Sequence, residues 1–101
     1  MKTFDERIEA IADHYGFESQ TEKAIEEMGE LIVSIKQMKK ADANRLSFVA
    51  FLDELTDVKI MVEQLEHLSV KENKEAQDYL IRTYEYKLQR QIMRINENEI
   101  T

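Results

Sequence analysis

The sequence predicts an all-α protein, a small four-helix bundle. It contains no proline and only two glycines, whereas β-sandwiches and doubly wound sheets need many turns rich in these residues. Charged residues make up 35% of the chain and hydrophobic residues 43%, a mixture typical of helices with one apolar and one charged face. With 101 residues, the chain is expected to form a single domain, residues 1–101, whose small core is completed by oligomerisation.

Four helices are predicted, and in chain order they span about residues 4–15, 19–40, 47–68 and 70–96. The first ends at Gly16, because glycine readily adopts the left-handed conformation that closes helices. Ser19 and Glu22 have the spacing of a capping box at the start of the second helix. The sequence ADANR, residues 41–45, breaks the apolar periodicity, which favours separate helices over one long coiled coil. The sequence SVKE, residues 69–72, and Asn73 both offer caps for the fourth helix.

Composition excludes several functional classes. The net charge of −7 argues against general nucleic-acid binding, which needs a basic surface. The absence of cysteine excludes disulfides, thiol nucleophiles and cysteine-based zinc sites. The first residues lack the apolar segment of a signal peptide, and no apolar run approaches the ~20 residues needed to cross a bilayer. A cytoplasmic location without a membrane partner is therefore expected.

Acidic residues interrupt the apolar patterns of the second and third helices. Glu27 and Glu30 share one helix face because they are three residues apart, and Glu54 and Asp57 share another. Glu27 and Asp57 lie equally far from Asp42, inside the connection, and so do Glu30 and Glu54. In an antiparallel hairpin, residues equally far from the turn come level. If the two helices pair in this way, all four carboxylates can meet at one height.

The surroundings of these acids favour a metal. Glu54 falls inside the apolar arc of the third helix, and no basic residue lies one turn away from it. Glu27 borders the apolar arc of the second helix, which consists of Ile25, Met28, Leu31, Ile32 and Ile35. Like charges gathered at low dielectric repel strongly, and hard divalent cations such as Mg²⁺ relieve that repulsion with oxygen ligands. The alternative is a solvated acidic face, with Glu54 reaching water or a base.

Other metal and phosphate sites find no support. Di-iron carboxylate bundles need Glu-x-x-His pairs, and neither His14 nor His67 has a glutamate three residues before it. Both histidines are expected at the surface or at helix ends. With glycine only at positions 16 and 29, a glycine-rich phosphate loop is impossible. Gly29, in mid-helix, is expected to mark a close approach of a neighbouring helix, since glycine there costs about 1 kcal/mol against alanine.

A basic stripe on the fourth helix offers another way to hold phosphate. Lys87, Arg90 and Arg94 follow the i, i+3, i+7 spacing of one helix face. Arginine binds phosphate through two parallel hydrogen bonds, and lysine acts as a point charge. The same stripe could merely offset the acidic faces of neighbouring helices, and the residues alone leave both alternatives open.

These motifs resemble a known family. The sequence EEMGE, followed by DELTD, resembles the signature of the all-α nucleoside triphosphate pyrophosphohydrolases, the MazG-like superfamily. That signature is Glu-Glu-x-x-Glu on one helix and Glu-x-x-Asp on the next. The resemblance covers residues 13–68 and the basic stripe. It is closest to the short, single-domain MazG-like proteins of phages and prophages of Gram-positive bacteria.

The resemblance implies a reaction and a set of residues. The reaction is hydrolysis of the α–β phosphate bond of an NTP or dNTP, which gives a nucleoside monophosphate and pyrophosphate. The implied ligands of Mg²⁺, or of Mn²⁺ in its place, are Glu27, Glu30, Glu54 and Asp57. Glu26 matches the first acid of the signature and would orient water or support an outer-shell ion. The implied substrate-binding residues are Gln20, which would read base or sugar, and Lys87, Arg90 and Arg94, which would hold the β- and γ-phosphates.

The family also implies a homodimer or a homotetramer. The base and sugar preference, the number of metal ions and the phage or chromosomal origin stay open at this point. The competing hypothesis is a non-enzymatic acidic helical module for interaction or regulation. In that case the acids are solvated, and Mg²⁺ changes neither the melting temperature nor nucleotide binding.

Overall fold

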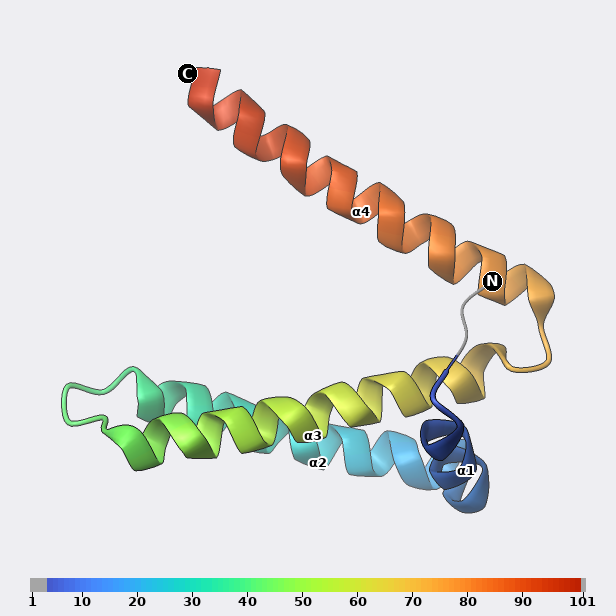
Figure 1. The fold of residues 1–101 in the computed structure, drawn as a ribbon, viewed down its shortest axis with the longest axis horizontal. Helices are drawn as coiled ribbons and strands as arrows, with labels where there is room; N and C mark the ends of the chain where they lie inside the picture. Colours follow the sequence, from blue (N-terminus) through green and yellow to red (C-terminus); the bar gives the residue numbers. More distant parts are fainter. Residues whose placement is uncertain (1–3, 101) are drawn as a thin grey trace. The chain divides into compact units, whose positions relative to one another are not determined.

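The computed structural model describes residues 4–100. These residues form four α-helices and no strand: α1 (Glu6–Tyr15), α2 (Phe17–Met38), α3 (Arg45–Val70) and α4 (Lys74–Ile100) (Figure 1). The prediction of an all-α chain with four helices is confirmed. None of the described helices combines the length and the apolar character needed to cross a lipid bilayer.

Polar side chains begin three of the helices. The side-chain oxygens of Asp5, Asn44 and Asn73 accept hydrogen bonds from backbone N–H groups in the first turns of α1, α3 and α4. Such caps satisfy N–H groups that have no partner within the helix. Of the two caps predicted for α4, Asn73 is confirmed, and α4 therefore begins at Lys74 and not at residue 70.

Gly16 joins α1 directly to α2. Its φ of 88° lies in the region that favours glycine, and its N–H donates to the Ala12 carbonyl oxygen at 2.8 Å. The predicted end of α1 at Gly16 is therefore confirmed. The ψ of Gly16 is 168°, however, so this glycine does not adopt the left-handed helical conformation that the sequence predicted. The predicted capping box at Ser19 is wrong. Because the chain turns within one residue, α2 begins at Phe17 and Ser19 already lies inside the helix.

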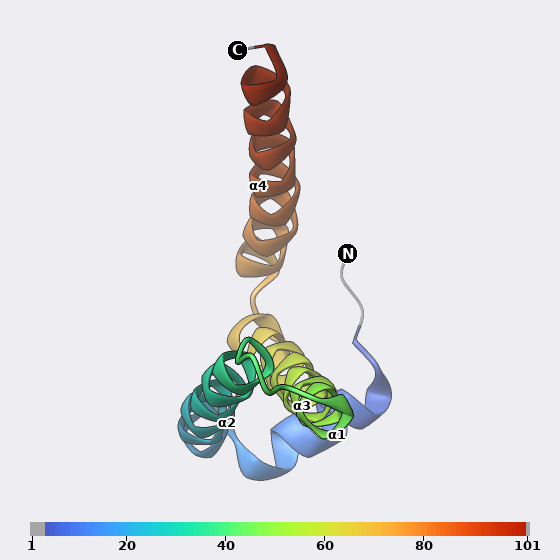
Figure 2. The same ribbon diagram turned by 90° about the vertical axis from the view of Figure 1, so that its left-hand side faces the viewer.

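The chain divides into two compact units, Phe4–Ser69 and the part from Val70 onward. A single domain over residues 1–101 therefore stays a prediction. In the first unit, α2 and α3 lie side by side and run in opposite directions, joined by a turn at residues 39–44 (Figures 1 and 2). Helix α1 lies at the end of this hairpin where α2 begins and α3 ends. The antiparallel pairing on which the acidic cluster depends is present.

The least exposed residues of α2 and α3 recur at alternating steps of three and four, as in paired antiparallel helices. On α2 they are Gln20, Ala24, Glu27, Leu31 and Ser34. On α3 the same spacing runs through Ser47, Phe51, Glu54, Val58, Met61, Leu65 and Leu68, and near the end of the helix Gln64 and His67 are buried as well. We call these two rows the seam of the hairpin. One acid therefore lies in each row, in a position that an apolar side chain would ordinarily occupy.

The seam of α2 differs from the apolar arc expected from its sequence. Of that arc, Leu31 alone belongs to the seam, and Ile25 and Ile32 are 72% and 54% exposed. The helix is rotated so that small and polar residues such as Ala24 and Ser34 face α3. Periodicity locates an apolar face but does not say which neighbour covers it. The first unit thus leaves much of an apolar helix face exposed.

His67 ties α1 to α3. It lies in the last turn of α3, so of the two predicted positions the helix end is confirmed and the surface is not. The imidazole is 6% exposed, and its Nε2 lies 2.9 Å from an Asp13 carboxylate oxygen. Its Nδ1 lies 3.8 Å from a Glu9 carboxylate oxygen, and the Phe4 ring packs edge-on against it at 5.5 Å. The two acids are one turn apart on α1, so both reach the same ring. His14 is exposed, as expected.

Candidate metal centre

Three of the predicted acids meet at one level of the hairpin. Carboxylate oxygens of Glu27, Glu30 and Glu54 all lie within 4.8 Å of one another, and we call these three residues the acidic cluster. Glu27 and Glu30 come from α2, and Glu54 comes from α3. Asp57 is exposed, about one turn further along α3, and is not part of the group. The hairpin therefore brings together three of the four predicted metal ligands.

The cluster contains carboxylate oxygens that lack a partner. Glu27 is only 8% exposed and Glu54 is half-buried. The Oε2 atom of each is shielded from solvent and has no hydrogen-bond partner among the described residues. Buried polar atoms are nearly always paired, since an unpaired one loses its hydration without compensation. These two oxygens are therefore suited to receive a cation.

Repulsion among the clustered carboxylates affects the pKa of Glu30. The Glu27 charge, partial desolvation and the Glu54 charge, in that order, raise the pKa of Glu30 above its ordinary value. A hydrogen bond with the Glu54 carboxyl group acts in the same direction. Raised carboxyl pKa values are expected where several carboxylates share one site.

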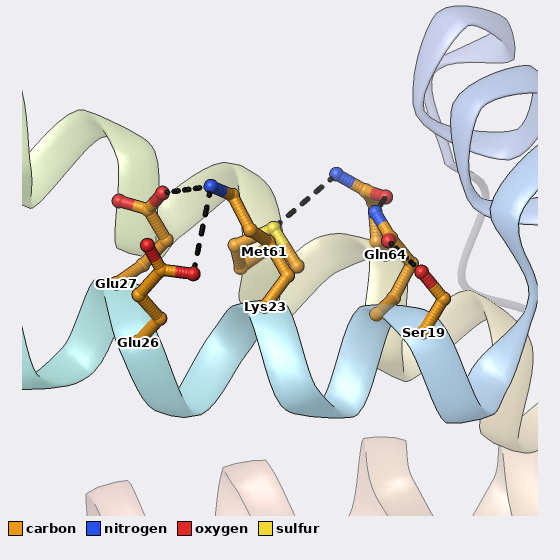
Figure 3. A network of polar contacts seen from close by, with 7 residues as sticks. Ser19, Lys23, Glu26, Glu27, Met61 and Gln64 are labelled. Atoms are coloured by element: carbon orange, nitrogen blue, oxygen red, sulfur yellow. Dashed lines mark hydrogen bonds and ion pairs between the residues drawn. The ribbon is translucent and has the colours of Figure 1, made fainter.

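Lys23 adds a positive charge that the sequence analysis did not single out. Its Nζ lies 3.2 Å from Glu27 Oε1 and 3.9 Å from Glu26 Oε2 (Figure 3). Its hydrogen bond with Glu27 and the charge of Glu26 raise the pKa of Lys23 above its ordinary value. The i, i+3 and i, i+4 spacings within KAIEE could have revealed these contacts. One ammonium against three clustered carboxylates leaves an excess of two negative charges, which a divalent cation would balance.

A groove of about 490 Å³ adjoins the acidic cluster. Its lining includes Glu26, Glu30 and Glu54 together with the small residues Gly29, Ser34 and Ala50. A Cβ atom added at Gly29 would meet nothing within 4 Å, so the predicted close approach of a helix at this glycine is wrong for the described residues. The reason is the rotation of α2, which places Gly29 outside the seam, on the groove.

The remaining predicted site residues are not members of the cluster. Gln20 is 6% exposed, and its Nε2 donates to Gln64 Oε1 at 2.7 Å, so that amide N–H group is committed within the hairpin. Lys87, Arg90 and Arg94 are exposed on α4, in the second unit. Within α4, the Arg90 guanidinium lies 5.7 Å from the centre of the Tyr86 ring.

The donor set fits a hard divalent cation. Mg²⁺ holds oxygen ligands at about 2.1 Å, so ligands on opposite sides of one ion are about 4.2 Å apart. The 4.8 Å spread of the three carboxylate oxygens is close to that span, and small side-chain rotations would close the difference. Comparison of the chain with protein-family models, curated proteins and solved structures finds no match.

Proposed function

We propose that this chain is a Mg²⁺-dependent nucleoside triphosphate pyrophosphohydrolase of the MazG-like, all-α type. It would cleave the α–β phosphate bond of an NTP or dNTP and release a nucleoside monophosphate and pyrophosphate. The observation that carries the proposal is the meeting of Glu27, Glu30 and Glu54 from two antiparallel helices. These residues belong to the acidic motif by which the sequence resembles that family.

In this proposal the acidic cluster holds Mg²⁺, or Mn²⁺ in its place, and Asp57 joins the ligand set by turning toward the cluster. The bound ion would polarise a phosphate oxygen and lower the pKa of a coordinated water. Glu26, which lines the groove and lies near Lys23, would orient the attacking water. Lys23 would restrain the Glu27 carboxylate so that its unpaired oxygen stays available.

The phosphates beyond the cleaved bond need positive charge, and the described helices offer no glycine-rich loop for them. We assign Lys87, Arg90 and Arg94 to the β- and γ-phosphates, through charge-assisted hydrogen bonds. Their i, i+3, i+7 spacing puts all three on one face of α4. The assignment requires α4 of the same chain or of a second copy to approach the cluster.

Oligomerisation is part of the same proposal. The apolar arc of α2 is exposed in the first unit, with Ile25 and Ile32 more than half accessible. Large contiguous apolar surfaces are uncommon on monomers and mark sites of association. A homodimer or homotetramer would cover this surface.

The test is a product analysis with a panel of NTPs and dNTPs, including dUTP, in Mg²⁺ and in EDTA. Ion-exchange chromatography should show monophosphate and pyrophosphate with Mg²⁺ only. Glu54→Gln should abolish turnover, whereas the control Asp53→Asn, an exposed neighbour on α3, should retain it. Release of orthophosphate, or full activity of Glu54→Gln, would contradict the proposal.

The exposed apolar surface also favours the second hypothesis, an acidic module that binds other proteins. A module of this kind would turn over no nucleotide in the same panel. Its melting temperature would also not respond to Mg²⁺. The two readouts together therefore separate the two functions.

A further inference from the structure

Two buried glutamines face each other across the hairpin. Gln20 on α2 and Gln64 on α3 are 6% and 3% exposed, and the Gln20 amide donates to the Gln64 carbonyl oxygen at 2.7 Å. The Gln64 amide nitrogen lies 3.7 Å from the Met61 sulfur, and the Ser19 hydroxyl lies 3.4 Å from the Gln20 carbonyl oxygen (Figure 3). The pair thus connects the two helices inside an otherwise shielded interface.

Buried amides are directional, in contrast to the apolar residues around them. Apolar contacts tolerate sliding because burial depends on area and not on orientation. A buried amide that loses its partner is penalised, because it has given up water without a replacement. Single polar residues in coiled-coil interfaces fix register for the same reason.

The glutamine pair and the acidic cluster share one register. Gln20 and Gln64 lie equally far from Asp42 along the chain, and so do Glu30 and Glu54. Sliding α3 by one turn, about 5.4 Å, would place Ala50 or Val58 at the level of Glu54 and would break the cluster. The same slide would offer Ile60 or Leu68 to Gln20 in place of Gln64, leaving its amide unpaired.

We propose that the Gln20–Gln64 pair sets the register of the α2–α3 hairpin and is thereby a positioning device for the acidic cluster. The pair touches neither metal nor substrate in this account, and it acts through the level at which Glu54 meets Glu30. The claim that the pair positions a metal site rests on the proposed function. The register of α2 against α3 is a property of the hairpin itself.

The test replaces both glutamines by methionine, an apolar side chain of similar length. Because the chain has no cysteine, Lys36→Cys and Lys59→Cys can be spin-labelled selectively, and both lysines are exposed. The two positions lie at different levels along the hairpin. A slide of α3 along α2 therefore changes the distance between the labels by nearly the full length of the slide. Pulsed electron paramagnetic resonance, on labelled protein diluted with unlabelled protein, measures that distance. Gln91→Met, at an exposed glutamine of α4, is the matched control.

We expect one narrow distance distribution in the parent and in Gln91→Met. In Gln20→Met/Gln64→Met we expect a second population, displaced by about one helical turn of 5.4 Å. Mn²⁺ affinity should fall by about tenfold or more, as it does when support of metal ligands is lost, while the melting temperature is not lowered. A simple packing role would lower stability without creating a second register.

An unchanged distance distribution in the methionine pair would overturn the proposal. If that variant does not fold, the same label distances are measured in Gln20→Leu/Gln64→Leu. If neither double variant folds, the glutamines have a general role in folding, and the proposal is overturned. The distances need neither metal nor nucleotide. A parent protein that binds no Mn²⁺ would therefore contradict the proposed function and leave the register result intact.

Discussion

Two carboxylates in the seam of the hairpin are the features that most favour a metal site. Glu27 and Glu54 occupy positions that an apolar side chain would normally fill, and each keeps one shielded oxygen without a partner. Glu30 stands beside them, exposed to water, with a raised pKa. Burial of this kind is unfavourable for the protein alone, and functional sites commonly retain such features.

Glu30 gives the protein without metal an unusual pH dependence. Its pKa in the folded state is raised above the ordinary 4.5, mainly by Glu27, so the stability contributed by its protonated form is lost as pH rises through the raised pKa. In EDTA, Glu30→Gln should therefore match the wild type at low pH and melt at a higher temperature at neutral pH. Thermal melts between pH 4 and pH 8 would test this, with Asp53→Asn as the control. A variant that is less stable than wild type at neutral pH would contradict the account.

Lys23 provides a second prediction. Lys23→Gln removes the ammonium that neutralises Glu27, so the unfolding free energy in EDTA should fall, and the fall should be small because the lysine is exposed to solvent. Added Mg²⁺ should restore the loss, because the metal replaces the missing positive charge. Urea denaturation with and without Mg²⁺ measures both effects. A loss that Mg²⁺ does not recover would identify a simple ion pair.

At the level of the helices, the periodicity of the sequence predicted which helices form and in what order. It did not predict how each helix is rotated about its own axis. Four helices and the level pairing of α2 with α3 followed from the apolar pattern and from equal distances to Asp42. The rotation of α2 did not, because its seam contains small and polar residues, Gln20 and Ser34 among them. The partners of His67 were also hidden, because Glu9 and Asp13 lie far from it in the sequence.

Gly29 tests the observed orientation of α2. Because a Cβ at this position meets nothing within 4 Å, Gly29→Ala should stabilise the protein by up to about 1 kcal/mol through helix propensity alone. Gly16→Ala should do the opposite, because Gly16 has a φ of 88° that side chains rarely adopt. Chemical denaturation of both variants gives the comparison. A destabilised Gly29→Ala would show that another chain or segment covers the groove.

For the molecule as a whole, the balance of buried and exposed apolar residues argues for association. The buried apolar side chains of the first unit are few, and two of the four least exposed, Ile8, Ala12, Ala24 and Met61, are alanines. Several larger ones, among them Ile25 and Phe48, are half-exposed or more. The sequence predicted oligomerisation from chain length, and the exposed arc on α2 supplies a physical reason for it.

Sedimentation should therefore give a mass of two or four times 12.0 kDa at micromolar concentration. Ile25→Glu/Ile32→Glu should lower that mass, since charges would replace apolar contacts on the exposed arc. The control is Lys36→Glu, a charge change at an exposed polar position of the same helix. A monomer at every concentration, or a mass that the isoleucine pair does not alter, would contradict this part of the account.

Metal binding by the acidic cluster is the central claim, and a Mn²⁺ titration without nucleotide, followed by electron paramagnetic resonance, tests it most directly. The proteins are the wild type, Glu54→Gln and Asp53→Asn, which change neighbouring acids of α3. The account predicts equal affinity for the wild type and Asp53→Asn, and a loss of about tenfold or more for Glu54→Gln. Absence of binding by the wild type, or equal affinity of all three proteins, would contradict it.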